Sequence, residues 1–207
     1  MKRLTIAIVG MVLSGAAFAG ASSYVDGGLV IGGKGSGSQD GAGAGNNNGG
    51  IEVTGAWAIN DLWYIGGVGG TYTREGNNGD TDNTYLAFNG GAVIGLTEKT
   101  DVFGEAALWL GSQDNPGTNA DNDPKAIEAK AGISTKVGDK LTLGATISLI
   151  AADLDTPQND SLRNFVWSAG GAWNFTPHMA ATFKLADGSN GVNGQTDIFR
   201  IGFRYTF

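Results

Sequence analysis

The sequence predicts an all-β fold, an antiparallel up-and-down transmembrane β-barrel, on the basis of three observations. Apolar residues alternate with polar or small ones along most of the chain after residue 21, which is typical of strands with one apolar face. The connections between these alternating segments are by turns short and long. The chain ends, over residues 200–207, in a further alternating segment whose last residue is aromatic.

Residues 1–21 are predicted to form a signal peptide. Two basic residues at positions 2 and 3 precede an apolar run that ends at Phe18, and small residues follow. The run is shorter than the roughly 18 to 20 apolar residues that a membrane-spanning helix needs. We therefore expect cleavage after Ala19 or Ala21, and one barrel domain over residues 22–207.

Ten strands are predicted, and an eight-strand barrel is kept as the alternative. Residues 51–59 illustrate the pattern, because Ile51, Val53 and Trp57 share one face while Glu52 and Thr54 share the other. An eight-strand barrel would require one hairpin to merge into a loop, and the first and ninth strands have the weakest patterns. The expected strands cover residues 24–34, 51–59, 62–73, 84–96, 101–112, 125–137, 141–152, 163–175, 179–187 and 196–207.

The lengths of the connections favour a barrel in the outer membrane. Tight turns are expected at residues 60–61, 97–100, 138–140 and 176–178, and the five other connections are longer and rich in Gly, Asn and Asp. Outer-membrane barrels have short turns on the periplasmic rim and longer loops on the external rim. Strands of roughly 10 residues cover an apolar band about 25 Å tall, and closing the sheet pairs every backbone group inside lipid.

Aromatic residues near the tight turns are predicted to form a girdle at the membrane boundary, where aromatic side chains are enriched. The six candidates each lie within a few residues of such a turn. They are Trp57, Trp63, Tyr64, Phe103, Trp173 and Phe175.

The last strand resembles the assembly signal of Gram-negative outer-membrane barrels, in which a polar residue and a glycine precede a terminal aromatic pair. Arg200, Gly202, Tyr205 and Phe207 carry this pattern. In architecture the mature chain resembles the small outer-membrane β-barrel proteins, such as the OmpA-type membrane domain and the opacity proteins, without a motif for one subfamily. The resemblance implies a monomer in the outer membrane of a Gram-negative bacterium, with external loops and periplasmic termini. It also implies as partners outer-membrane lipid, lipopolysaccharide, the barrel-assembly machinery and periplasmic chaperones.

The predicted register directs eight charged side chains into the lumen. Unpaired charge in a narrow interior is costly, so these residues should pair with one another. The first and last strands must adjoin to close the barrel, so we expect Asp26 to approach Arg204 across that seam, with Arg200 near the level of Glu52 and Lys184. The full set is Asp26, Glu52, Glu105, Glu128, Lys130, Lys184, Arg200 and Arg204.

Several chemical functions are disfavoured by the sequence. The chain has a formal net charge of −7, which argues against a nucleic-acid partner, and its lack of cysteine excludes disulfides and thiolate metal sites. The stretch at residues 28–37 resembles a phosphate-binding loop, but position 35 is glycine where a magnesium-binding hydroxyl is needed. His178, the one histidine, lies on a tight turn rather than near the long loops. We expect no enzymatic activity, no cofactor and no metal.

The long loops carry many carboxylates. We interpret them as solvated loops, with weak divalent-cation binding as the alternative reading. The acids are Asp40, Glu75, Asp80, Asp82, Asp114, Asp121, Asp123, Asp153, Asp155 and Asp160.

The function predicted first is a structural or surface-interaction role for a barrel whose lumen is largely filled by its own charges. Two alternatives stay open. A small passive pore for ions or small solutes comes second, and an outer-membrane enzyme is a distant third.

Overall fold

The structure is a computed structural model that describes residues 22–32, 48–74, 81–114, 125–153, 162–190, 194–195 and 198–207. The predicted signal peptide and most of the acids assigned to the long loops, from Asp40 to Asp160, lie outside these residues. So does the second part of the phosphate-loop-like stretch, after Gly32. Among the residues that the structure describes, no helix is long and apolar enough to cross a membrane.

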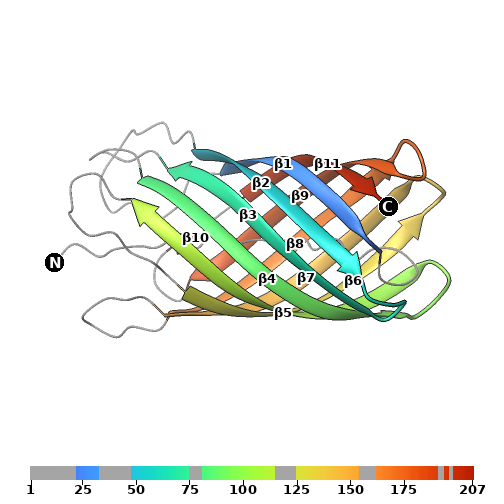
Figure 1. Cartoon of the computed structure of the whole chain (residues 1–207), viewed down its shortest axis with the longest axis horizontal. Coiled ribbons are helices and arrows are strands. Elements are labelled where there is room, and N and C mark those ends of the chain that lie inside the picture. Colours follow the sequence, from blue (N-terminus) through green and yellow to red (C-terminus); the bar gives the residue numbers. More distant parts are fainter. Residues whose placement is uncertain are drawn as a thin grey trace.

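The described residues form a closed barrel of ten antiparallel strands, as the sequence predicts (Figure 1). Neighbours in sequence pair with one another, and β11 pairs with both β9 and β1, which closes the sheet without a free edge. A further two-residue strand, β10, pairs only with the end of β9. The strands are β1 (Tyr24–Gly32), β2 (Asn48–Ala58), β3 (Trp63–Arg74), β4 (Thr81–Gly95), β5 (Thr100–Asp114), β6 (Lys125–Val137), β7 (Leu141–Asp153), β8 (Leu162–Asn174), β9 (Met179–Asn190), β10 (Gly194–Gln195) and β11 (Ile198–Thr206).

Several strands extend further into polar sequence than predicted, β2 among them, which begins at Asn48 instead of residue 51. β4 begins at Thr81 instead of residue 84, and β9 ends at Asn190 instead of residue 187. The added residues pair with neighbouring strands, and the Thr73 hydroxyl donates a hydrogen bond to Asp82 Oδ1 over 2.7 Å. The composition of these segments indicates a loop, but adjacent strands supply backbone partners that extend the ladder.

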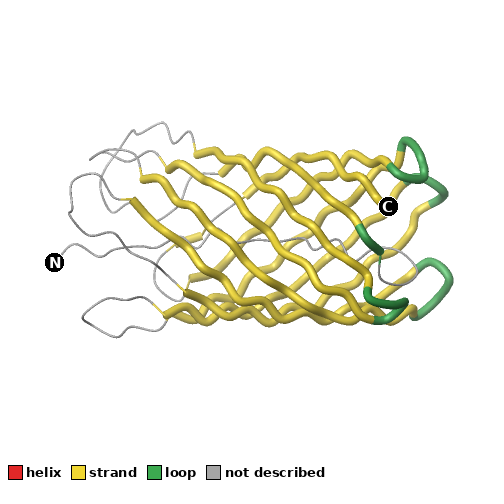
Figure 2. The backbone as a smooth tube through the Cα atoms, in the orientation of Figure 1, coloured by secondary structure: helices red, strands yellow, loops and turns green. Residues whose placement is uncertain are grey.

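The short turns gather at one rim of the barrel, together with the C-terminus (Figure 2). Side chains support these turns. Asn60 Oδ1 accepts the backbone N–H groups of Leu62 and Trp63, and Thr97 Oγ1 accepts those of Lys99 and Thr100. Such bonds let the chain reverse within a few residues.

The two faces of the barrel wall are inverted relative to a water-soluble protein. Along β7, Leu143, Ile147 and Leu149 are exposed on the outside, while Thr146 and Ser148 are buried inside. The same alternation holds along β6. An outer surface covered with large apolar side chains requires an apolar surrounding medium. The interior therefore carries the polar chemistry of the molecule.

Candidate functional site

All eight charged residues predicted to face the lumen are buried inside the barrel, none of them more than 6% exposed. They form two groups. The seam group comprises Asp26, Glu52, Arg200 and Arg204, at the junction of the first and last strands. The wall group comprises Glu105, Glu128 and Lys130, on β5 and β6. Lys184 on β9 is treated separately below.

The seam group is centred on Asp26. Arg204 is its direct partner in the β1–β11 pairing, and the Arg204 guanidinium donates to Asp26 Oδ2 at 3.2 Å, so the expected contact across the seam is present. Arg200 Nη2 donates to Asp26 Oδ1 at 2.6 Å, and Arg200 Nε lies 2.9 Å from Glu52 Oε1. The hydroxyl of Tyr85 donates to the other Glu52 oxygen over 3.0 Å. One arginine therefore joins carboxylates from β1 and β2.

The wall group is centred on Lys130. Its Nζ lies 2.8 Å from Glu105 Oε1 and 3.6 Å from Glu128 Oε1. Glu105 Oε2 accepts hydrogen bonds from the Tyr64 hydroxyl and from Asn89 Nδ2, both at 2.8 Å. Lys130 thus forms ion pairs with two buried carboxylates at once.

Lys184 connects the two groups electrostatically. Its side chain is 2% exposed, and its ammonium lies within electrostatic range of the carboxylates of Glu52 and Glu128 and of the cations of Lys130 and Arg200. Glu52 lies on β2 and Glu128 on β6, so Lys184 is within electrostatic range of charges on separate parts of the wall. With Lys184, the network has four carboxylates and four basic groups, namely Asp26, Glu52, Glu105 and Glu128 against Lys130, Lys184, Arg200 and Arg204.

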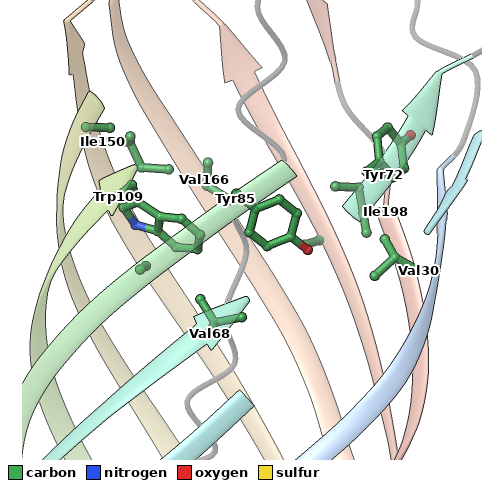
Figure 3. Close-up of a cluster of buried hydrophobic side chains, with 11 residues drawn as sticks. Val30, Val68, Tyr72, Tyr85, Trp109, Ile150, Val166 and Ile198 are labelled. Carbon is green, nitrogen blue, oxygen red and sulfur yellow. The ribbon is translucent and has the colours of Figure 1, made fainter. Parts of the chain in front are cut away.

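Two buried apolar clusters adjoin the network. The larger draws residues from nine of the barrel strands, and its Tyr85 and Trp109 have ring centroids 6.0 Å apart (Figure 3). Trp109 Nε1 donates to Glu128 Oε2 at 3.0 Å, so this cluster supplies hydrogen bonds to both groups. The smaller cluster contains Tyr24, whose ring lies 4.4 Å below the Arg204 guanidinium. Apolar packing holds the charged side chains in position.

Comparison with known proteins identifies the fold. No protein-family model matches the chain, and no curated protein matches it in sequence. Among solved structures, it is similar to an outer membrane channel from Pseudomonas putida F1, with 13% identity, a TM-score of 0.61, and coverage of 95% of this chain and 100% of the other. It is also similar to the β domain of the Bordetella autotransporter BrkA, with 12% identity, a TM-score of 0.61, and coverage of 90% and 100%. The chain has the fold of an outer-membrane β-barrel.

The predicted aromatic girdle of this outer-membrane barrel needs a correction. Tyr64 and Phe103 are buried inside, at 4% and 6% exposure, so their assignment to the girdle is wrong. The prediction used their distance from a turn, whereas the face of a strand residue depends on alternation, and Phe103 shares a face with Glu105. The other four candidates are exposed on the outer surface near the short turns, and their place at the membrane boundary stays a prediction. These are Trp57, Trp63, Trp173 and Phe175.

Other inward-facing residues were missed in the sequence. Asp101, which is 3% exposed, lies on the same face of β5 as Glu105, so alternation alone could have found it. The side chains that donate hydrogen bonds to the carboxylates also share the inward face of their strands, but their partners do not follow from the sequence. They are Tyr64, Tyr85, Asn89, Trp109 and Thr182.

Replacing Tyr64 by Phe should test the contribution of these donors. The change removes one hydrogen bond to the buried Glu105 carboxylate and is expected to lower the free energy of unfolding by about 1.5–3 kcal/mol. The measurement is a urea titration of the refolded barrel in phospholipid vesicles, followed by tryptophan fluorescence. Tyr205→Phe is the matched control, because Tyr205 is exposed on the outer surface. Equal losses in the two variants would contradict the role assigned to Tyr64.

Proposed function

We propose that this barrel is a closed outer-membrane scaffold with a structural or surface-interaction role, and that its lumen is filled by its own charge network together with the buried apolar clusters. One observation carries the proposal. Each of the eight carboxylate oxygens of Asp26, Glu52, Glu105 and Glu128 lies beside a donor or a cationic nitrogen of the protein itself. Charges that are satisfied in this way have little capacity left for a passing ion.

The balance of charge supports the same reading. A conducting lumen that selects ions needs an excess of one sign facing water, as in rings of acidic or basic side chains. Counting Asp101, the buried charged residues of the described part are five carboxylates against four basic groups, which is close to balance. Lys184 lies within electrostatic range of charged residues of both signs in the two groups. The interior is suited to stabilising the wall rather than to attracting a solute.

Because the lumen is occupied by the protein's own side chains, we assign the function to the outer surfaces of the barrel. In outer-membrane barrels the rim opposite the short turns faces outward, so we assign the long connections to the cell exterior and both termini to the periplasm. The apolar exterior faces outer-membrane lipid and lipopolysaccharide. The barrel-assembly machinery and periplasmic chaperones are the partners expected during biogenesis, and we expect a monomer.

We propose no catalytic activity for the barrel. His178, the one histidine of the chain, lies in the turn before β9, and its Nδ1 is 2.9 Å from the backbone oxygen of Thr206. This contact ties the turn to the last strand. The arrangement favours a structural role for the imidazole at the short-turn rim.

Single-channel conductance tests the scaffold against a pore. The chain without its predicted signal peptide, residues 22–207, is refolded and inserted into a planar bilayer beside Arg200→Ala and Glu52→Ala. We expect insertion without steady conductance for the unchanged chain. Steady conductance that becomes more cation-selective in Arg200→Ala and more anion-selective in Glu52→Ala would replace the scaffold with a small passive pore. One of the similar structures is described as a channel, and this measurement separates that function from ours.

A further inference from the structure

We propose that Arg200, Asp26 and the glycine pair Gly28–Gly202 form a register lock, which fixes how β1 and β11 align when the barrel closes. The inference is independent of the proposed function, because it holds for a scaffold and a pore alike. It assigns to residues of the last strand a role inside the folded barrel, in addition to the recognition role that their sequence pattern suggests.

The outer face of the seam cannot set this alignment. The outward residues of β11 near the seam are Phe199, Ile201 and Phe203, and those of β1 include Leu29 and Ile31. A shift of two residues keeps every side chain on its own face, because strands have a period of two. On the outer face, such a shift would replace one contact between apolar side chains by another. The information that selects one register must come from the inner face.

On the inner face, two glycines form a notch at the seam. Gly28 and Gly202 are direct partners in the β1–β11 pairing. A Cβ atom on Gly28 would lie 2.7 Å from the Ile201 backbone oxygen and 2.8 Å from Arg200 Cζ. One on Gly202 would lie 2.7 Å from the Gly27 backbone oxygen and 2.9 Å from Arg200 Nη1. The guanidinium of Arg200 therefore lies against the backbone of both strands, at a place where only glycine leaves enough room.

Hydrogen bonds and ion pairs from three other strands hold the guanidinium in this notch. Asp26 Oδ1 on β1 accepts from Nη2, and Glu52 on β2 lies beside Nε. Thr182 on β9 accepts from Nη1 at 3.4 Å and donates to Asp26 Oδ1 at 3.3 Å. All of these contacts are buried, so their loss is not compensated by water.

A shift of two residues would disrupt the notch and the contacts together. Gly28 would then face Arg200 or Arg204 instead of Gly202, and Asp26 would lose its direct partner Arg204. The guanidinium would meet side chains where it now meets bare backbone. The native register is therefore the one in which both arginines reach Asp26.

Cysteine pairs can measure the register directly, because the natural chain contains no cysteine. Leu29→Cys with Ile201→Cys joins direct partners and reports the native register. Leu29→Cys with Phe203→Cys reports a shift of two residues in one direction, and Leu29→Cys with Phe199→Cys reports the same shift in the other direction. The full chain is expressed in a Gram-negative host, and disulfide formation in isolated outer membranes is read as a shift in electrophoretic mobility.

In the Asp26→Asn background, the ratio of shifted to native crosslink should rise roughly tenfold, which corresponds to the loss of charge-assisted hydrogen bonds at the seam. Glu105→Gln is the matched control, because it also removes a buried carboxylate charge but lies in the wall group. Its ratio should stay at the level of the unchanged chain. An equal rise in both backgrounds would overturn the register lock.

A comparison of two adjacent glycines, Gly28 and Gly27, provides a second, independent test. Gly28→Ala should raise the shifted crosslink, whereas Gly27→Ala should not, because a Cβ atom on Gly27 meets nothing within 4 Å. If Asp26→Asn fails to fold, Arg200→Lys takes its place, since it keeps the charge but cannot contact Asp26, Glu52 and Thr182 together. The three seam variants are Asp26→Asn, Gly28→Ala and Arg200→Lys, and their controls are Glu105→Gln and Gly27→Ala. If all three seam variants lose the native and the shifted crosslinks while both controls fold, the proposal is also overturned, because the seam is then required for folding and not for register.

Discussion

Replacing Lys130 by Met is expected to lower the free energy of unfolding by about 3–5 kcal/mol, which is the usual cost of removing one partner from a buried ion pair. The reason is that Lys130 Nζ lies within 4 Å of two carboxylates, Glu105 at 2.8 Å and Glu128 at 3.6 Å. Met has a similar length and no charge, so both carboxylates lose their ion-pair partner without a large change in volume. The measurement is the urea titration in vesicles used for Tyr64→Phe.

Lys99→Met serves as the control, because Lys99 lies exposed in the turn between β4 and β5 and should change stability by less than about 0.5 kcal/mol. Adding Glu128→Gln to Lys130→Met should recover part of the loss, since it removes one of the two uncompensated charges. A Lys130→Met barrel as stable as the Lys99→Met barrel would show that the wall group is not held by this lysine.

Placing an arginine on the outer face at mid-strand should have the second largest effect. Ile147 lies at the centre of β7 and is 54% exposed. If that surface faces lipid, Ile147→Arg should lower the free energy of unfolding by about 2–4 kcal/mol, the range for a cationic side chain at the bilayer midplane. The unfolding of the variant is followed in phospholipid vesicles by tryptophan fluorescence.

The control lies at the end of a neighbouring strand. Val137 is the last residue of β6, beside a short turn, and is 50% exposed. Val137→Arg should cost only about 0–1 kcal/mol, because an arginine near the interface reaches water. Equal effects at the two positions would mean that depth along the barrel has no influence, which contradicts a membrane around the outer surface.

The sequence was sufficient to predict the barrel, its strand number and its charged interior. Alternation assigns each strand residue to one face, so it placed Asp26 and Arg204 inside, and barrel closure required their strands to adjoin. Tyr64 and Phe103 were misplaced only because distance from a turn was used instead of alternation. These errors could have been avoided with the same information.

The partners within the network could not have been predicted in the same way. Tyr64 on β3 reaches Glu105 on β5 by crossing β4, and Tyr85 on β4 reaches Glu52 on β2 by crossing β3. Each hydroxyl passes over a glycine, since a Cβ on Gly91 would lie 2.7 Å from the Tyr64 Oη and one on Gly70 would lie 2.6 Å from the Tyr85 Oη. Such contacts depend on strand stagger and side-chain conformation, which alternation does not define.

Contacts that cross an intervening strand also determine how the wall responds to force. Arg200 on β11 contacts Glu52 on β2 and so bridges over β1, just as the two tyrosines bridge over β4 and β3. A single strand pulled from the edge of an opened barrel would have to break its backbone ladder together with bonds between strands that are not its immediate neighbours. Peeling one strand at a time is thereby disfavoured, and mechanical extraction from the membrane should remove these strands in groups of three.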